Sequence, residues 1–89
     1  MHLYTILLDY AGGTYVAQIG ATDEEAAVRD WLGKLRSGRI ADAVSEEIAV
    51  AFDGTMRRPL PLDGLAGAWC VSGNARQGLA LVNIVKTAT

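Results

Sequence analysis

The segment that decides the fold is Leu79-Ala80-Leu81-Val82-Asn83-Ile84-Val85, near the end of the 89-residue chain. Its aliphatic residues predict a β-strand, which would place alternate side chains on opposite faces of a sheet. One face carries Leu79, Leu81 and Val85, whereas the other carries Ala80, Val82 and Ile84. In a sheet with one solvent-exposed face, each strand alternates apolar and polar residues. Here only Asn83 interrupts the apolar run. Both faces of this strand are therefore expected to be covered.

Residues 2–20 predict a β-hairpin. In the stretch 3–8, Tyr4, Ile6 and Leu8 share one face and the remaining leucines share the other, so this strand is also apolar on both sides. The stretch 14–19 alternates with a period of two. Between them, Gly12-Gly13 supplies the positive φ angles that a short hairpin turn requires.

The stretch Thr22-Asp23-Glu24-Glu25 predicts the start of a helix. Thr22 and Glu25 have the spacing of a capping box. In this motif the Thr22 hydroxyl accepts a hydrogen bond from the backbone N–H of Glu25, and the Glu25 carboxylate accepts one from the backbone N–H of Thr22. One apolar stripe follows at helical spacing, made of Val28, Trp31, Leu32 and Leu35. Gly38 suits the left-handed stop that ends many helices. The predicted helix runs from about Asp23 to Ser37.

Residues 40–52 fit two patterns. Ile40, Val44, Ile48 and Phe52 are spaced by four, as in an amphipathic helix. Ile48, Val50 and Phe52 also alternate with alanines, as in a strand. The polar run at 45–47 and the several alanines between Ala41 and Ala51 favour the helix, which Asp53-Gly54 would end.

The remaining chain predicts a connection and a second hairpin. Pro59 and Pro61 exclude both a helix and a central strand over 55–67, where the neighbouring Leu60 and Leu62 are expected to pin the connection to the body. Strands at 68–72 and 79–85 flank a loop at 73–78. The prediction is one α+β domain over residues 1–89, in the order ββ-α-α-ββ. Its two helices pack on one face of a four-stranded antiparallel sheet.

Two short helices cover only one face of such a sheet, and monomers seldom expose a large apolar patch. The leucine–proline segment is too short to hide the other face, so we expect a homodimer. Our candidate interface is the face with Leu79, Leu81, Asn83 and Val85, although the pattern leaves open which face receives the helices. Another protein is the alternative partner.

Composition and charge argue against several classes of function. Hydrophobic residues make up 51% of the chain and charged residues 20%, which is not the composition of a disordered chain. No apolar run approaches the ~18 residues of a membrane span, and no signal-peptide pattern is present, so we expect a cytoplasmic protein. A net charge of −2 argues against nucleic-acid binding. Arg57 and Arg58 form the one candidate anion contact.

No catalytic or cofactor motif stands out. Cys70 is the single cysteine, which excludes an intramolecular disulfide and a cysteine-rich zinc site, and its place in a strand predicts an inert core thiol. His2 is the single histidine and lies before the first strand, where a base would be poorly held. We expect no metal, no cofactor and no enzyme. The alternative is a small-molecule binder or enzyme with a pocket at the subunit interface, suggested by Asn83.

Two stretches together resemble a known family. Gly-Gly-Thr-Tyr-Val-Ala (residues 12–17) in a hairpin, followed by Thr-Asp-Glu-Glu-Ala-Ala (residues 22–27) at a helix start, resembles the N-terminal part of HicB-like antitoxins. The similarity spans Tyr4 to Leu35 and implies an antitoxin-type protein that binds a partner. That family has a third strand before this helix and a DNA-binding segment after it, whereas here Ile19 runs into the helix within a few residues.

Overall fold

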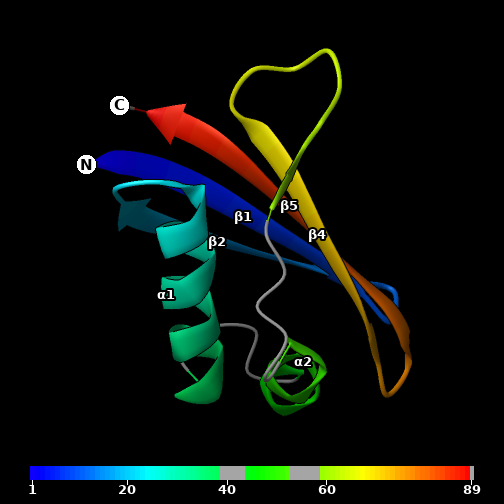
Figure 1. Cartoon of the computed structure of the whole chain (residues 1–89). Helices are drawn as coiled ribbons and strands as arrows, with labels where there is room; N and C mark the ends of the chain where they lie inside the picture. Colours follow the sequence, from blue (N-terminus) through cyan, green and yellow to red (C-terminus); the bar gives the residue numbers. More distant parts are fainter. Residues whose placement is uncertain (39–43, 53–58, 89) are drawn as a thin grey trace.

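The computed structural model describes residues 1–38, 44–52 and 59–88, in which five strands form one antiparallel sheet and two helices pack against it (Figure 1). In chain order the elements are β1 (His2–Tyr10), β2 (Gly13–Ala21), α1 (Glu24–Arg36), α2 (Ser45–Phe52), β3 (Leu60–Pro61), β4 (Ala68–Ala75) and β5 (Gly78–Ala88). The predicted α+β class, the antiparallel sheet and the two helices are confirmed.

The predicted count of four strands and the predicted order ββ-α-α-ββ are both wrong, because β3 adds a fifth strand between α2 and β4. The strand order is β2-β1-β5-β4-β3, and β3 pairs with Trp69 and Cys70 at the margin of the sheet. An edge strand tolerates Pro61 because one side of it needs no ladder hydrogen bonds. Of the two leucines predicted to pin this segment, Leu60 is 68% exposed and does not, whereas Leu62 is half-buried. The backbone also holds the segment, since the Leu62 N–H donates to the Ala68 carbonyl at 3.0 Å.

The first hairpin is confirmed, with its turn one residue earlier than predicted. The register of β1 and β2 runs without a shift from His2 opposite Ala21 to Tyr10 opposite Gly13. The positive φ angles belong to Ala11 (51°) and Gly12 (81°), not to Gly12 and Gly13. A two-residue turn with both φ angles positive matches the right-handed twist of its strands.

The second hairpin is confirmed, but its predicted loop at 73–78 is too long. Strand β4 continues to Ala75, and only Arg76 and Gln77 form the turn. Gly73 belongs to the strand and is buried: a Cβ there would meet the Phe52 ring at 3.3 Å. This glycine therefore allows the close approach of α2 to β4. Strand β5 also extends beyond its predicted end, to Ala88.

Helix α1 agrees with its predicted range, but its cap differs. Asp23 is the N-cap, and its Oδ1 accepts a hydrogen bond from the Ala26 N–H at 2.8 Å. The predicted capping box on Thr22 is therefore wrong by one residue. A carboxylate satisfies the same free N–H as a hydroxyl and also places a negative charge at the positive end of the helix. Gly38 ends the helix as predicted, with φ of 73°.

Helix α2 confirms the helical alternative for Ser45–Phe52 over the strand alternative. The predicted start at Ile40 lies in 39–43 and the predicted stop at Asp53-Gly54 lies in 53–58. Both ranges fall outside the described residues.

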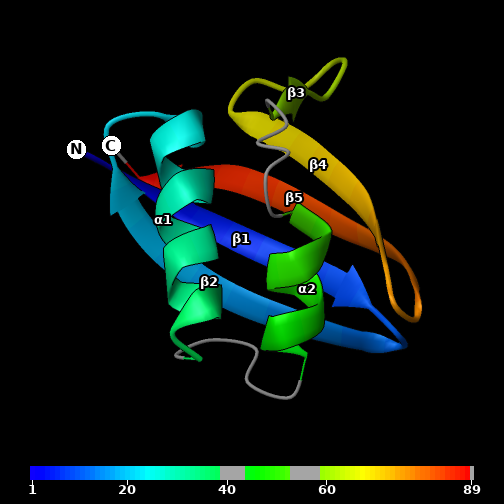
Figure 2. The ribbon, with the colours of Figure 1, turned by 60° about the horizontal axis from the view of Figure 1, so that its bottom comes forward.

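Both helices lie on the same side of the sheet (Figures 1 and 2). The predicted α1 stripe of Val28, Trp31, Leu32 and Leu35 is buried there. It meets the central strands through Tyr4, Ile6, Leu8, Val82 and Ile84, which are also buried. The Trp31 and Phe52 rings, with centroids 6.3 Å apart, join the two helices. Among the described residues, no helix is both long and apolar enough to cross a bilayer.

Polar contacts fasten the second hairpin turn to α2. The Gln77 side-chain amide donates to both carboxylate oxygens of Glu47, at 3.2 and 3.0 Å, and Arg76 lies 3.7 Å from the same carboxylate. The backbone N–H of Gln77 donates to the Tyr10 hydroxyl at 2.7 Å. These contacts hold the end of β1, the β4–β5 turn and α2 together.

The packing of α2 generates a prediction about stability. Ile48 is fully buried, whereas Val50 on the same helix is 69% exposed. Ile48→Ala should lower the free energy of unfolding by about 2–5 kcal/mol, because it removes core contacts and leaves a cavity. The matched variant Val50→Ala should change it by less than about 0.5 kcal/mol. Urea unfolding followed by circular dichroism measures both, and equal losses would contradict this placement of α2.

Candidate functional site

The helices leave one face of the sheet uncovered, and we call it the open face. The strand registers place the following side chains on it: Leu3, Thr5, Leu7 and Asp9 of β1, Thr14, Val16 and Gln18 of β2, Leu60 of β3, Ala68, Cys70, Ser72 and Asn74 of β4, and Leu79, Leu81, Asn83 and Val85 of β5. Val82 and Ile84 are fully buried on the opposite, helix-covered face. The helices therefore cover the face with Val82 and Ile84, a choice that the sequence pattern left open.

All of the predicted interface residues lie on this open face. Leu79 and Val85 are 60% and 40% exposed, while Leu81 and Asn83 are half-buried among their neighbours. Within residues 1–38, 44–52 and 59–88, no helix packs on this side. The structure therefore brings the predicted residues together on an uncovered surface.

A row of side chains crosses the whole open face. By register, Val16 lies opposite Leu7, Leu7 opposite Asn83, Asn83 opposite Cys70, and Cys70 opposite Leu60. Asn83 is thus the middle of the row, on the central strand of the sheet. Sequence reasoning missed Val16 and Leu60, although the alternation of β2 places Val16 on the face opposite the buried Ile19.

Further polar side chains lie on both sides of this row. On one side the Asp9 carboxylate accepts a hydrogen bond from the Thr14 hydroxyl at 2.7 Å. On the other side the Gln18 amide donates to the Thr5 hydroxyl at 3.2 Å, and Thr5 also contacts the Thr87 hydroxyl. Asp9 is the only charged side chain that the described strand registers place on the open face. A mostly apolar row with polar side chains around it is similar to the core and rim of protein interfaces.

Cys70 and His2 depart from their predicted settings. Cys70 is half-buried and lies on the open face, not in the core. Its cross-strand neighbours are Asn83 of β5 and Leu60 of β3. His2 opens β1, and its imidazole lies edge-on to the Tyr4 ring with centroids 6.3 Å apart, so the sheet holds it. Since Tyr4 faces the helices, His2 and Cys70 lie on opposite faces and do not form a pair.

The other candidates add little to the site. Arg57 and Arg58, the candidate anion contact, lie outside the described residues. In the part of the chain that is described, no group of three or more histidine, cysteine, aspartate or glutamate side chains is placed to hold a metal.

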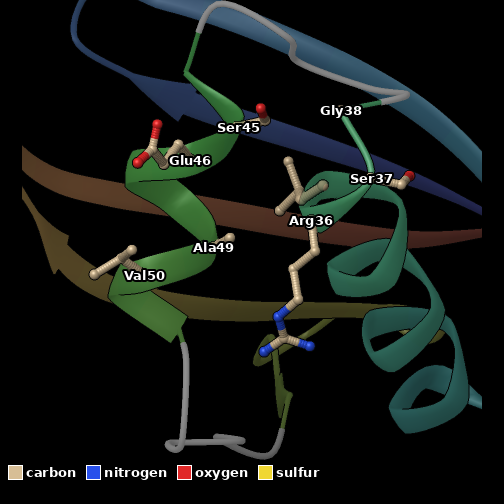
Figure 3. Close-up of a pocket in the computed structure, with 8 residues that line it drawn as sticks. Arg36, Ser37, Gly38, Ser45, Glu46, Ala49 and Val50 are labelled. Carbon is tan, nitrogen blue, oxygen red and sulfur yellow. The ribbon is translucent and has the colours of Figure 1, made fainter.

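A hollow of about 490 Å³ lies between the end of α1 and the start of α2 (Figure 3). It is lined by Leu35, Arg36, Ser37, Gly38, Ser45, Glu46, Ala49 and Val50. The Arg36 side chain runs along the gap between the helices, whereas Glu46 and Val50 point away from α1. This hollow lies in the helix layer, so it is not the pocket around Asn83 that the sequence suggested.

Tyr4 of β1 is a buried ionisable residue that lies near the start of α1. Its ring packs against Trp69 with centroids 6.0 Å apart. Burial raises the pKa of the Tyr4 hydroxyl above its usual value, and the nearby negative charges of Glu24 and Asp23 raise it further.

Comparisons with protein-family models, curated proteins and solved structures found no match for this chain. The resemblance to HicB-like antitoxins remains a prediction. In the structure β2 ends at Ala21 and α1 begins at Glu24, so no strand lies between them.

The raised pKa of Tyr4 predicts an alkaline loss of stability. Above pH ~10 an unfolded tyrosine ionises while the folded Tyr4 keeps its proton, so the free energy of unfolding should fall as pH rises. Tyr4→Phe removes this contribution, so the variant should lose less stability between about pH 9 and 11. Urea unfolding of both proteins across this range measures the two slopes. Identical slopes would contradict the assignment.

Proposed function

We propose that this chain is a small, non-catalytic interaction module that works as a cytoplasmic homodimer, with the open faces of two copies packed against each other. One observation carries the proposal: Val16, Leu7, Cys70 and Leu60 flank Asn83 in a mostly apolar row across a sheet face that no described helix covers. Large apolar patches on monomers commonly mark interaction sites.

Charge favours a second copy as the occupant of this face. Each chain has a formal charge of −2, yet the charged side chain on the open face is Asp9, at its border. Two such faces can therefore meet without strong repulsion between like charges. A two-fold contact requires a self-complementary surface, and the Asn83 amide at the centre offers both a donor and an acceptor to its own copy.

The size of the open face also fits a dimer. Strands spaced at about 4.8 Å and rising about 3.3 Å per residue give roughly 600 Å² for the four long strands. Specific interfaces bury about 600–1,000 Å² on each partner, so two open faces reach the lower end of this range.

A second candidate function is small-molecule binding, now favoured by the hollow between α1 and α2. Its volume of about 490 Å³ lies within the range of ligand pockets. A thermal-shift screen against metabolites tests this alternative, because a ligand that binds the folded state raises the melting temperature. Substitution of Arg36 by Ala should abolish such a shift if the ligand occupies the hollow.

Two aspartate substitutions on opposite faces of β5 test the homodimer. Leu81→Asp places a carboxylate on the open face, so this variant should stay folded but sediment at half the wild-type mass. Ile84→Asp places the same group in the core and should unfold the protein, because an unpaired buried charge costs several kcal/mol. Sedimentation at micromolar concentration, with circular dichroism, measures both outcomes.

Val50→Asp is the matched control, since it adds the same charge at an exposed site of the helix layer. This control should keep the wild-type mass. A folded Leu81→Asp protein that also keeps the wild-type mass would refute the homodimer, as would a wild-type protein that sediments at 9.4 kDa.

Cys70 gives an independent test, because it is the only thiol of the chain and lies in the central row. Its reaction with a small thiol reagent should slow at least about tenfold as protein concentration rises through the dissociation constant, since association covers the thiol. A Cys70→Ser, Ser37→Cys variant moves the thiol to the exposed end of α1 and should react at one rate throughout. A constant rate for Cys70 would contradict burial of the open face.

A further inference from the structure

Strand β2 forms one margin of the sheet, with β1 as its single neighbour among the described strands (Figure 2). It is nine residues long, from Gly13 to Ala21, and its register with β1 shows no bulge. A strand at a sheet edge presents a row of unpaired backbone groups that can pair with another chain.

Natural edge strands usually carry a device that prevents such pairing, for example a charged side chain, a proline, a bulge or a very short length. At the opposite margin, β3 has two of these devices, because it is two residues long and contains Pro61, although it covers only Trp69 and Cys70 of β4. Strand β2 has none of these devices, since its sequence GTYVAQIGA lacks both charges and proline.

The hairpin register shows which backbone groups of β2 face outward. Tyr10 and Gly13 flank the two-residue turn, and such a pair exchanges backbone hydrogen bonds. Because bonding alternates along an antiparallel ladder, Tyr15, Ala17 and Ile19 bond to β1 as well. The N–H and C=O groups of Thr14, Val16, Gln18 and Gly20 therefore point away from β1, outward in the plane of the sheet.

We propose that β2 pairs antiparallel with β2 of a second copy of this chain, about a two-fold axis at Ala17. This register uses the whole strand, because Ala17 is its midpoint. Val16 then lies opposite Gln18 of the partner subunit, and Thr14 lies opposite Gly20 of the partner subunit. All of the outward backbone groups find partners, which gives about eight hydrogen bonds between the chains.

The side chains also suit this register. Ala17 meets its own copy on the helix-covered face, where the pair has no hydrogen bonds, its Cα atoms lie about 4.5 Å apart, and the small side chains fit without conflict. Tyr15, which is half-buried, lies opposite Ile19 of the partner subunit, an aromatic–β-branched pair of the kind that stabilises sheets. No charged side chain of β2 opposes a like charge.

The edge pairing uses backbone groups and does not depend on the proposed packing of open faces. Its two-fold axis runs perpendicular to the sheet, so both open faces of the pair lie on one side and form a single larger surface. Two such pairs joined by their open faces would make a tetramer with perpendicular two-fold axes, a common symmetry of homo-oligomers. Only this last step rests on the proposed function.

Disulfide trapping tests the edge register directly. In a Cys70→Ser background, Ala17→Cys should form a dimeric disulfide under mild oxidation, because the two Cα atoms lie within the range that a disulfide spans. Thr14→Cys in the same background is the matched control and should stay unlinked, because the register places its copy about 20 Å away. Face-to-face packing would leave the two Ala17 residues on opposite outer sides, so the trap separates the two interfaces.

A proline substitution tests the backbone contacts. Gln18→Pro removes an outward N–H, which β1 does not use, whereas Gln18→Ala removes the same side chain and keeps that N–H. Both substitutions are made in the Leu81→Asp background, which leaves only the edge pairing. The Gln18→Ala protein should sediment at twice the chain mass. The dissociation constant of the edge dimer should be at least about tenfold higher for the Gln18→Pro protein.

Amide hydrogen exchange completes the test without a substitution. The N–H groups of Val16 and Gln18 should be protected from exchange in the assembled protein and exposed on dilution, while that of Ala17 stays protected throughout. The edge proposal is overturned if Ala17→Cys forms no dimer while Val16 and Gln18 exchange freely at every concentration. A different result would refute the open-face dimer: the Leu81→Asp protein would keep the wild-type mass.

Discussion

The pairing of β5 with both β1 and β4 is the contact on which the rest of the structure depends. It makes the most apolar strand of the chain the centre of the sheet. A central strand has to keep water from both of its faces, yet both described helices follow β2 and pack on one side. The helix-covered side becomes the core through Val82 and Ile84, and the other side becomes the open face.

Small residues on the helix-covered face allow α2 to approach the sheet closely. Gly73 and Ala80 lie opposite each other on that face, and the Phe52 ring rests against Gly73. A larger side chain there would push α2 off the sheet. On the open face the neighbouring cross-strand pair, Leu81 with Ser72, is larger. Steric room thus adds to the greater apolar content of the helix-covered face, which forms the core.

The features that the sequence predicted correctly are those with a clear period. Alternation gave the first hairpin, and the stripe that includes Trp31 and Leu35 gave α1. Strand β3 could not be predicted, because two residues with a proline have no period. Gly73 and Asn74 were assigned to a loop, since glycine and asparagine favour turns when no partner helix is considered. The residues of the candidate interface were predicted, but both faces of β5 are apolar, so no periodicity could identify the uncovered one.

The register of β1 with β5 joins Ile6 to Ile84, almost the full length of the chain apart. Closing a loop of that length costs conformational entropy before any contact compensates for it. Folding rates fall as contacting residues lie farther apart in sequence, so this sheet should assemble slowly for its size. On the ribosome, the β1–β2 hairpin and α1 would emerge long before β5, with the inner edge of β1 still bare. A chain of this topology has to survive synthesis with its central position empty, so its apolar strands are exposed to aggregation until β5 arrives.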